Sequence, residues 1–154
     1  MRRRSEICVS LWKNSSMEAC DISFDELRVG DTATISRTWS EDDVMVFAQL
    51  SGDENPLHMD AVYADTTQFK NRLVHGMLVG SLCSTLVGMH IPGKRCLYLT
   101  QSLSFKKPVF IGDTTEATVL VTAKSESTRV LGLSLTITCR DSVVIEGEAQ
   151  VAVL

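Results

Sequence analysis

The sequence predicts a single α+β domain in which an antiparallel sheet wraps around one apolar helix. At 154 residues the chain has room for one hydrophobic core of ordinary size. The stretch from Gly76 to about His90 is apolar nearly all round, whereas four later segments alternate apolar and polar residues with a period of two. In so short a chain, an antiparallel sheet is the economical way to bury such a helix.

Composition excludes several classes of protein. Hydrophobic residues make up 44% of the chain and charged residues 22%, which is typical of a globular protein and not of a disordered or collagen-like one. The net charge is −4, and the 15 Lys and Arg form no dominant patch, so we expect no nucleic acid partner. The longest apolar stretch, Met77 to Met89, is shorter than the roughly 20 residues of a membrane span. We therefore expect no membrane association.

The cysteines indicate a reducing compartment. They are odd in number and scattered, without a Cys-x-x-Cys pair or Cys/His ligand spacing, so we expect free thiols and no metal site. Cys83 falls on the apolar helix, where packing is a better interpretation than a nucleophilic role. His75 and His90 have no carboxylate or thiol at ligand spacing, which favours ordinary local hydrogen bonding over metal binding. The full set of cysteines is Cys8, Cys20, Cys83, Cys96 and Cys139.

The N-terminal segment differs from the rest. Residues 1–20 begin with Met1 and three arginines, but no continuous apolar run follows, so a secretory signal is not expected. We predict a disordered extension over 1–20 and a folded domain over 21–154. The expected location is cytoplasmic. A mitochondrial location is the alternative that the Arg and Ser content leaves open, although Glu6 and Glu18 argue against a presequence.

The first elements are a strand and a short helix. From Asp31 the apolar residues Ala33, Ile35 and Trp39 alternate, with Arg37 breaking the pattern, which predicts a strand with one buried face. Ser40 and Asp43 form a capping-box-like pair at the start of a helix that Gly52 ends.

A polar loop and the main helix follow. The segment Ser51 to Asp60 is rich in Asp, Asn and Pro and predicts a loop, and Ala61 to Thr66 predicts a short helical piece. The main helix, from Gly76 to about His90, should be buried on every side because it is apolar on nearly every side. Pro92-Gly93 ends it.

The rest of the domain is predicted to be strands. Short polar links between them, at residues 126–128 and 141–142, predict antiparallel hairpins. The expected strands are Cys96 to Phe105, Thr114 to Ser125, Arg129 to Arg140 and Val143 to Val153.

Two features carry candidate chemistry. Asp53 and His58 lie five residues apart across a Pro-containing loop, whose irregular backbone can aim an acid and a base at one point. Turn formation alone also accounts for these residue types. Gly76 opens the apolar helix, where backbone N–H groups can approach a ligand and stabilise a developing oxyanion. A tight bend is an equally good interpretation of this glycine.

The same residues resemble a known family. The run Ser51 to Asp60, Phe69 and Val74-His75-Gly76-Met77 are similar to the hydratase 2 motif of MaoC-like (R)-specific enoyl-CoA hydratases. The resemblance extends from about Phe24 to the C-terminus and is strongest to short, single-domain bacterial enzymes of polyhydroxyalkanoate synthesis. Its further matching segments are Pro92-Gly93-Lys94, Tyr98-Leu99, Gln101 to Lys106, Pro108 to Phe110, and Gly112-Asp113.

The resemblance implies a hot-dog fold, a homodimer, and reversible syn hydration of trans-2-enoyl-CoA to (R)-3-hydroxyacyl-CoA. It implies no redox cofactor or metal. By position, Asp53 and His58 match the catalytic pair, Asn55 a residue that holds the site, and Gly76 the glycine whose amide polarises the thioester carbonyl. Among substrate-binding positions, Ser84 matches a small polar residue near the pair, and Val87 and Ala152 match acyl-pocket residues.

Some alternatives stay open at this point. Lys94-Arg95 and Lys106-Lys107 are candidates to meet the phosphates of coenzyme A, with solvated surface charge as the alternative. A thioesterase of the same fold would need a nucleophile near the carbonyl carbon, and a non-catalytic acyl-CoA sensor would have no use for the Asp53/His58 pair.

Overall fold

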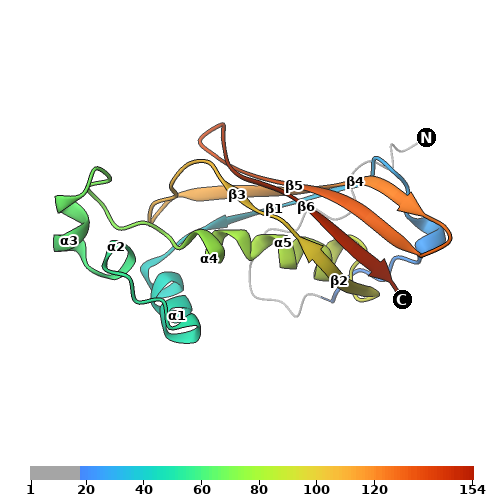
Figure 1. Ribbon diagram of the computed structural model, residues 1–154, viewed down its shortest axis with the longest axis horizontal. Coiled ribbons are helices and arrows are strands. Elements are labelled where there is room, and N and C mark those ends of the chain that lie inside the picture. Colours follow the sequence, from blue (N-terminus) through green and yellow to red (C-terminus); the bar gives the residue numbers. More distant parts are fainter. Residues whose placement is uncertain (1–17) are drawn as a thin grey trace.

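The computed structural model describes residues 18–154 and contains one sheet with one long helical segment across it (Figure 1). The strands are β1 (Thr32–Thr38), β2 (Cys96–Gln101), β3 (Ser104–Phe105), β4 (Thr114–Ser125), β5 (Val130–Cys139) and β6 (Ser142–Val153). The helices are η1 (Phe24–Glu26), α1 (Glu41–Ser51), α2 (Pro56–Met59), α3 (Ala61–Thr66), α4 (Gly76–Gly80), α5 (Leu82–Thr85) and η2 (Leu86–His90).

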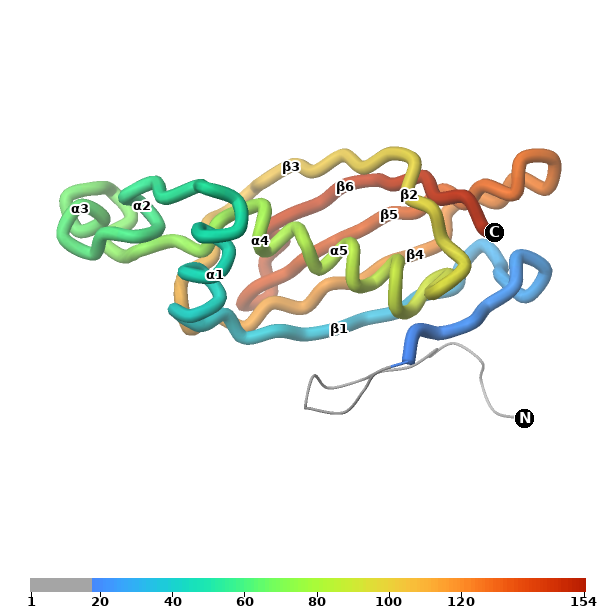
Figure 2. Tube along the Cα trace, turned by 90° about the horizontal axis from the view of Figure 1, so that it is seen from below, coloured from blue at the N-terminus to red at the C-terminus, as the bar shows by residue number. Residues whose placement is uncertain are grey.

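The sheet is six-stranded and antiparallel throughout, in the order β1-β4-β5-β6-β2, with β3 also paired to β6. The helical segment α4–α5–η2 runs across one face of this sheet, and the three short helices α1 to α3 gather beyond one end of it (Figure 2). This is the expected α+β class and the expected hot-dog arrangement of a sheet around a helix.

Strand β5 shows how alternation positions the core. Its odd-numbered residues from Leu131 to Cys139 are all buried, whereas the residues between them are only partly buried. Because successive side chains of a strand point to opposite faces, one face of β5 packs against the helix and the other is closer to solvent. The predicted alternation is confirmed.

The long helical segment departs from its prediction in one respect. Residues 76–90 are helical, but the segment changes character, ending in the π-type turn η2. Val79, Leu82 and Leu86 are buried against the sheet. Met77 is 61% exposed, so burial on every side is wrong for this chain, because the sheet covers one side of the helix only. The exposed residues of the segment are Met77, Ser81 and Ser84.

The predicted strand Cys96 to Phe105 is two strands. β2 and β3 both pair with β6, but the chain breaks its register between them. Around the break, the N–H of Ser102 donates to the carbonyl of Glu148 at 2.8 Å. The carbonyl of Ser102 lies so close to Gly147 that a Cβ there would be 1.9 Å from it. A glycine opposite the break therefore permits the close approach, a cross-strand feature that alternation along one strand does not report.

The start of α1 forms as predicted, whereas Trp39 lies just outside the strand that was predicted to contain it. Ser40 accepts a hydrogen bond from the N–H of Asp43, whose carboxylate accepts from the N–H of Ser40, which is a complete capping box. Trp39 follows β1 instead of lying within it. It is nevertheless buried, and its Nε1–H donates to Oγ1 of Thr115 at 2.9 Å.

The predicted N-terminal extension lies outside the described residues as far as residue 17. Cys20, at its end, joins the domain: its N–H donates to the carbonyl of Met89, and its carbonyl accepts from the N–H of Lys94, both at 2.9 Å. Cys83 is a free, buried thiol, and burial raises its pKa to about 11, which favours the packing role. Within residues 18–154 no helix is both long and apolar enough to cross a membrane.

His90 generates a testable dependence of stability on pH. Its ring is 2% exposed, neither nitrogen has a hydrogen-bond partner among the described residues, and burial lowers the pKa of the ring below 6.5. The unfolded chain therefore takes up the proton more readily, so the free energy of unfolding falls as the pH drops through about 6.5. We expect His90→Leu to reduce this loss. Urea unfolding between about pH 7 and pH 5 measures it, and equal losses in both proteins would contradict the assignment.

Candidate active site

The local sequence brings Asp53 and His58 together in two steps. Gly52 ends α1 with a φ of 78°, and Asp53 then accepts a hydrogen bond on Oδ1 from the N–H of Asn55 at 3.3 Å. Asn55 caps α2, because its side-chain oxygen accepts from the N–H of Leu57 at 2.9 Å. His58 is thereby carried on a one-turn helix that begins directly after the Asp53 turn.

The loop predicted for residues 51–60 is wrong over Pro56–Met59, which form α2. An Asn cap followed by proline at the first helical position is a helix-start signal. This signal, Asn55 followed by Pro56, is present in the sequence, and it outweighs the general preference of Asp, Asn and Pro for turns.

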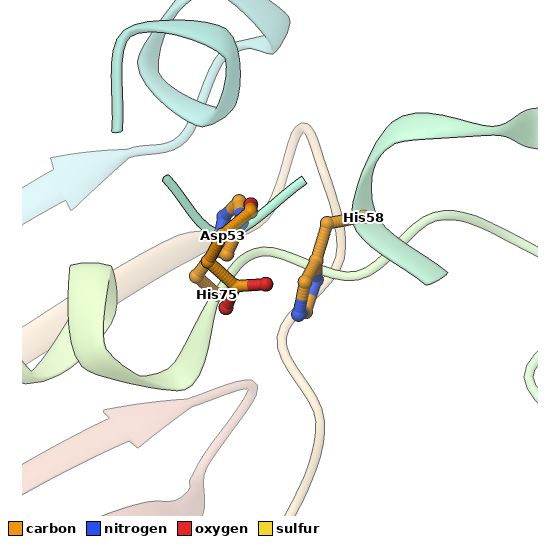
Figure 3. A group of neighbouring side chains, drawn as sticks. All are labelled: Asp53, His58 and His75. Atoms are coloured by element: carbon orange, nitrogen blue, oxygen red, sulfur yellow. The ribbon is translucent and has the colours of Figure 1, made fainter. Parts of the chain in front are cut away.

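Three side chains converge at this point. A carboxylate oxygen of Asp53 and one ring nitrogen each of His58 and His75 lie within 4.8 Å of one another (Figure 3). A water that makes two hydrogen bonds of about 2.8 Å bridges atoms up to about 5.6 Å apart. A separation of up to 4.8 Å between Asp53 and His58 is within the reach of one bridging water molecule.

The hydrogen bonding of His58 sets its tautomer. Nδ1 lies 2.8 Å from the carbonyl oxygen of Leu73, and because a carbonyl only accepts, Nδ1 carries the hydrogen. In the neutral ring, Nε2 then has a free lone pair. Burial lowers the pKa of His58, and the ring of His75 adds to this, while the bond to Leu73 and the charge of Asp53 oppose it. The net lowering favours a neutral, basic ring near pH 7.

A cavity of about 410 Å³ lies beside His58. Gly76 lines it as the first residue of α4, a position whose N–H has no carbonyl partner within the helix. A Cβ on Gly76 would lie 2.9 Å from ring atoms of Phe105, so a side chain here would force that ring to move. The remaining lining residues are Phe69, Leu73, Val74, Val79, Lys106, Lys107, Pro108, Val109 and Ile145.

His75 is a site residue that sequence reasoning missed. Its ring stacks on that of His58 with centroids 3.9 Å apart, and its Nε2 lies 2.9 Å from the backbone carbonyl oxygen of Asp53. This hydrogen bond spans 22 residues and is not the local one expected. Two signals in the sequence point to it: the adjacent Gly76 places His75 at the start of the helix, and His75 belongs to the matching run Val74-His75-Gly76-Met77.

The geometry of this cluster suits a water better than a metal. Zinc holds its ligand atoms at about 2.0–2.2 Å in a tetrahedron, so these atoms lie about 3.4 Å apart. The planes of the His58 and His75 rings are only 30° from parallel. Their in-plane lone pairs therefore run side by side and do not point at one ion.

The predicted substrate-binding residues are spread along the molecule. Lys106 lines the same cavity as His58, and its amine pairs with the carboxylate of Glu146 at 2.7 Å. Lys94 lies beyond the far end of the helix, paired with Asp21 at 2.8 Å. Ser84 is exposed on α5, Val87 is fully buried in the core, and Ala152 is half-buried on β6. None of these four belongs to the described lining of the catalytic cavity.

A larger, more polar cavity of about 660 Å³ lies on the other side of the bridge between Leu73 and Phe110. Its basic residues already have partners: Arg72 pairs with Glu41, Arg140 pairs with Asp113, and Lys70 donates to a backbone carbonyl. It contains neither member of the Asp53/His58 pair, so the smaller cavity is the candidate active site.

The family model described as "MaoC like domain" matches residues 27–137, which is most of the domain. The chain belongs to the MaoC-like family. The (R)-specific enoyl-CoA hydratase of Rhodospirillum rubrum is 45% identical over 130 residues, covering 84% of this chain and 90% of that protein. The predicted family is thus confirmed.

Solved structures agree with this membership. The (R)-hydratase of Aeromonas caviae involved in PHA biosynthesis is 45% identical, with a TM-score of 0.81, over 83% of this chain and 98% of that one. R-hydratase PhaJ1 of Pseudomonas aeruginosa is 37% identical, with a TM-score of 0.83, over 88% and 87% of the two chains. The hot-dog fold is thus confirmed by structures of MaoC-like proteins.

Proposed function

We propose that this MaoC-like protein is an (R)-specific enoyl-CoA hydratase, which converts trans-2-enoyl-CoA and water reversibly into (R)-3-hydroxyacyl-CoA. The observation that carries the proposal is the convergence of the Asp53 carboxylate and the His58 ring within 4.8 Å, next to a cavity that His58 and the first residue of α4, Gly76, both line. The hydratase names of relatives that match nearly the whole domain support it.

The chemistry follows from what hydration requires. Water is a weak nucleophile, and C3 of the enoyl group becomes electrophilic only when the thioester carbonyl is polarised. Nε2 of His58 takes a proton from the water as its oxygen bonds to C3. The electron pair of the double bond moves toward the carbonyl oxygen, which accepts a hydrogen bond from the N–H of Gly76.

Asp53 completes the reaction by participating in proton delivery to C2. The proton that His58 takes from the water passes through Asp53 to C2, so one proton leaves the water, one reaches C2, and both groups return to their starting protonation states. Because coupled groups titrate as a unit, the roles of Asp53 and His58 within the pair are interchangeable in this scheme. Asn55 supports both members, since it caps the helix of His58 and donates its N–H to Asp53. The substrate supplies its own electron sink, and the scheme uses no cofactor.

Basic residues at the cavity suggest how coenzyme A lies. Lys106 and Lys107 line the same cavity as His58, and the amine of Lys107 donates to the hydroxyl of Ser142, a neutral partner. We assign these two lysines to the phosphates of coenzyme A. The predicted phosphate contact at Lys94, the predicted substrate-binding position of Ser84 near the pair, and the predicted acyl contacts at Val87 and Ala152 remain predictions.

A homodimer is part of the proposal. β2 ends the sheet order, so one of its sides has unpaired backbone groups. It also exposes Leu97 and Leu99, and Met77 on α4 is exposed as well. A second copy of the chain placed against β2 would pair this edge and cover Leu97 and Leu99.

A cytoplasmic location is the final part. The relatives with the highest identities named above come from the bacteria R. rubrum and A. caviae. The basic start of the chain, which leaves a mitochondrial location as the alternative, falls outside the described residues.

A crotonyl-CoA assay tests the proposal. The purified protein should consume the enoyl absorbance and yield the (R)-3-hydroxy product on chiral analysis. Asp53→Asn and His58→Gln should each reduce turnover by about 10²-fold or more, since each removes a proton-transfer group with little change in volume.

Asp65→Ala is the matched control, because Asp65 lies on α3 outside the cavity and contributes only a backbone carbonyl to Lys70. It should keep parental turnover. Release of free thiol without hydration would indicate a thioesterase, and binding without turnover would indicate a sensor. An (S) product or parental activity in Asp53→Asn would contradict the proposed site.

The pH dependence of kcat/KM is a second test. The base must be neutral to accept a proton, and the pKa of His58 is lowered mainly by burial. Activity should therefore persist below pH 6.5 and fall only as the pH drops through the lowered pKa. An acid limb above about pH 6.5 would contradict this assignment.

The dimer is tested by light scattering on the full chain. The wild type should have twice the monomer mass, and Leu99→Arg should shift the population toward monomer, because it places a charge in the apolar edge of β2. Val143→Arg is the control, since Val143 is an exposed apolar residue of β6 beside the turn from β5. A monomeric wild type would contradict the proposal.

A further inference from the structure

His75 contacts both members of the catalytic pair from a buried position. It is 1% exposed, and it is the residue immediately before Gly76 at the start of α4. Its Nε2–H donates to the backbone carbonyl of Asp53, and one face of its ring stacks on His58. The ring of Phe47 packs against it at 5.0 Å with a tilt of 57°.

We propose that His75 is a positioning residue for the reaction: it ties Asp53 through a hydrogen bond and His58 through ring stacking to the start of the long helix. This inference rests on the proposed function. In the scheme above, His75 touches neither the water nor the substrate. It acts by holding the two reacting groups in position.

The hydrogen bond gives Asp53 a long-range anchor. The side chain of Asp53 is exposed, and its carboxylate is held locally by the N–H of Asn55, two residues away. The bond from His75 connects the same residue to an element 22 positions later in the chain. Loss of this bond would leave the turn between α1 and α2 free to shift relative to Gly76.

The stacking restrains the His58 ring. The bond from Nδ1 to the carbonyl of Leu73 fixes one edge of that ring but permits rotation about the bond. A flat surface at a centroid distance of 3.9 Å restricts that rotation. The two contacts together define the direction in which Nε2 faces the water. Since displacements near 1 Å reduce turnover by up to about 10²-fold, such restraint matters for the rate.

Packing alone does not account for a histidine here. Nδ1 of His75 is buried and has no hydrogen-bond partner among residues 18–154. A buried polar atom without a partner destabilises the fold, so an apolar side chain would serve a purely structural role better. The hydrogen bond that the His75 ring does make is from Nε2–H to the backbone carbonyl oxygen of Asp53.

The pH readout must consider every charge near the cluster. The titratable groups that face His75 are the carboxylate of Asp53 from the loop and the ring of His58 from α2. α1 contributes the uncharged Phe47, and Lys106 and Lys107 line the cavity beside His58. His75 itself contributes to lowering the pKa of His58. Removal of its imidazole should therefore move the acid limb of activity to higher pH.

Two variants separate the two contacts. His75→Phe keeps a flat ring for stacking but removes the donor to Asp53, and His75→Gln keeps an N–H donor but removes the ring. His90→Gln is the matched control, because His90 is an equally buried histidine at the other end of the same helical segment. Steady-state kinetics with crotonyl-CoA across pH give kcat, KM and the acid limb. NMR titration of the labelled His58 ring gives its pKa independently of activity.

We expect kcat of His75→Phe to fall by about ten-fold or more, with KM within about two-fold of the parent, and His75→Gln to recover part of this loss. In both variants the His58 pKa and the acid limb should rise, and His90→Gln should be parental in all three.

Parental kcat and an unchanged acid limb in both folded variants, with only a lower melting temperature, would overturn the inference. A rise in KM at parental kcat would also overturn it, because it would indicate substrate contact. An inactive wild type would instead reject the proposed function, and the NMR titration would still decide whether His75 sets the state of His58.

Discussion

The packing of one side of the helical segment 76–90 on the sheet is the interaction on which the rest of the structure depends. Val79, Leu82 and Leu86 are buried in the core together with the inward-facing residues of β5. This burial holds the start of α4 at the end of the sheet where the short helices gather (Figure 2). His75 and Gly76 consequently stand at the start of the helical segment that packs on the sheet, and they also belong to the candidate active site.

Asp53 and His58 lie outside the sheet and the long helical segment. Asp53 and His58 come from the excursion between β1 and α4, whose three helices are short. Val44 of this excursion packs into the core, and hydrogen bonds of His58 to Leu73 and of His75 to Asp53 hold the two residues of the pair to the start of the helical segment. Leu73 is in turn bridged to Phe110, and Val74 to Val109. The candidate site thus lies where the segment between β1 and α4 meets the sheet and the long helical segment, and its cavity lies at this junction.

Some apolar side chains of the helix and of the edge strand β2 are also left exposed in the single chain. Met77, Leu97 and Leu99 are exposed although the neighbouring core is well buried. A second copy of the chain on this surface would change the surroundings of Ser84 on α5 and of β2, the edge strand that pairs with Ala152.

Local signals carried most of what the sequence determined. The alternation in β5, the capping box at Ser40 and Asp43, and the helical character of residues 76–90 each depend on neighbours within a few positions, and all are present in the structure. The meeting of Asp53 and His58 belongs to the same class, because a turn and a one-turn helix bring them together within six residues.

Only the tertiary structure decided the contacts that cross between elements. The division of β2 from β3 depends on Gly147 of another strand, the exposure of Met77 depends on which side the sheet covers, and the role of His75 depends on a partner 22 residues away. Periodicity reports which face of one element is apolar, but it does not report which element will lie against that face. The packing of the whole chain decides which elements meet. This packing places the His75 ring against His58 and the cavity beside the Asp53/His58 pair.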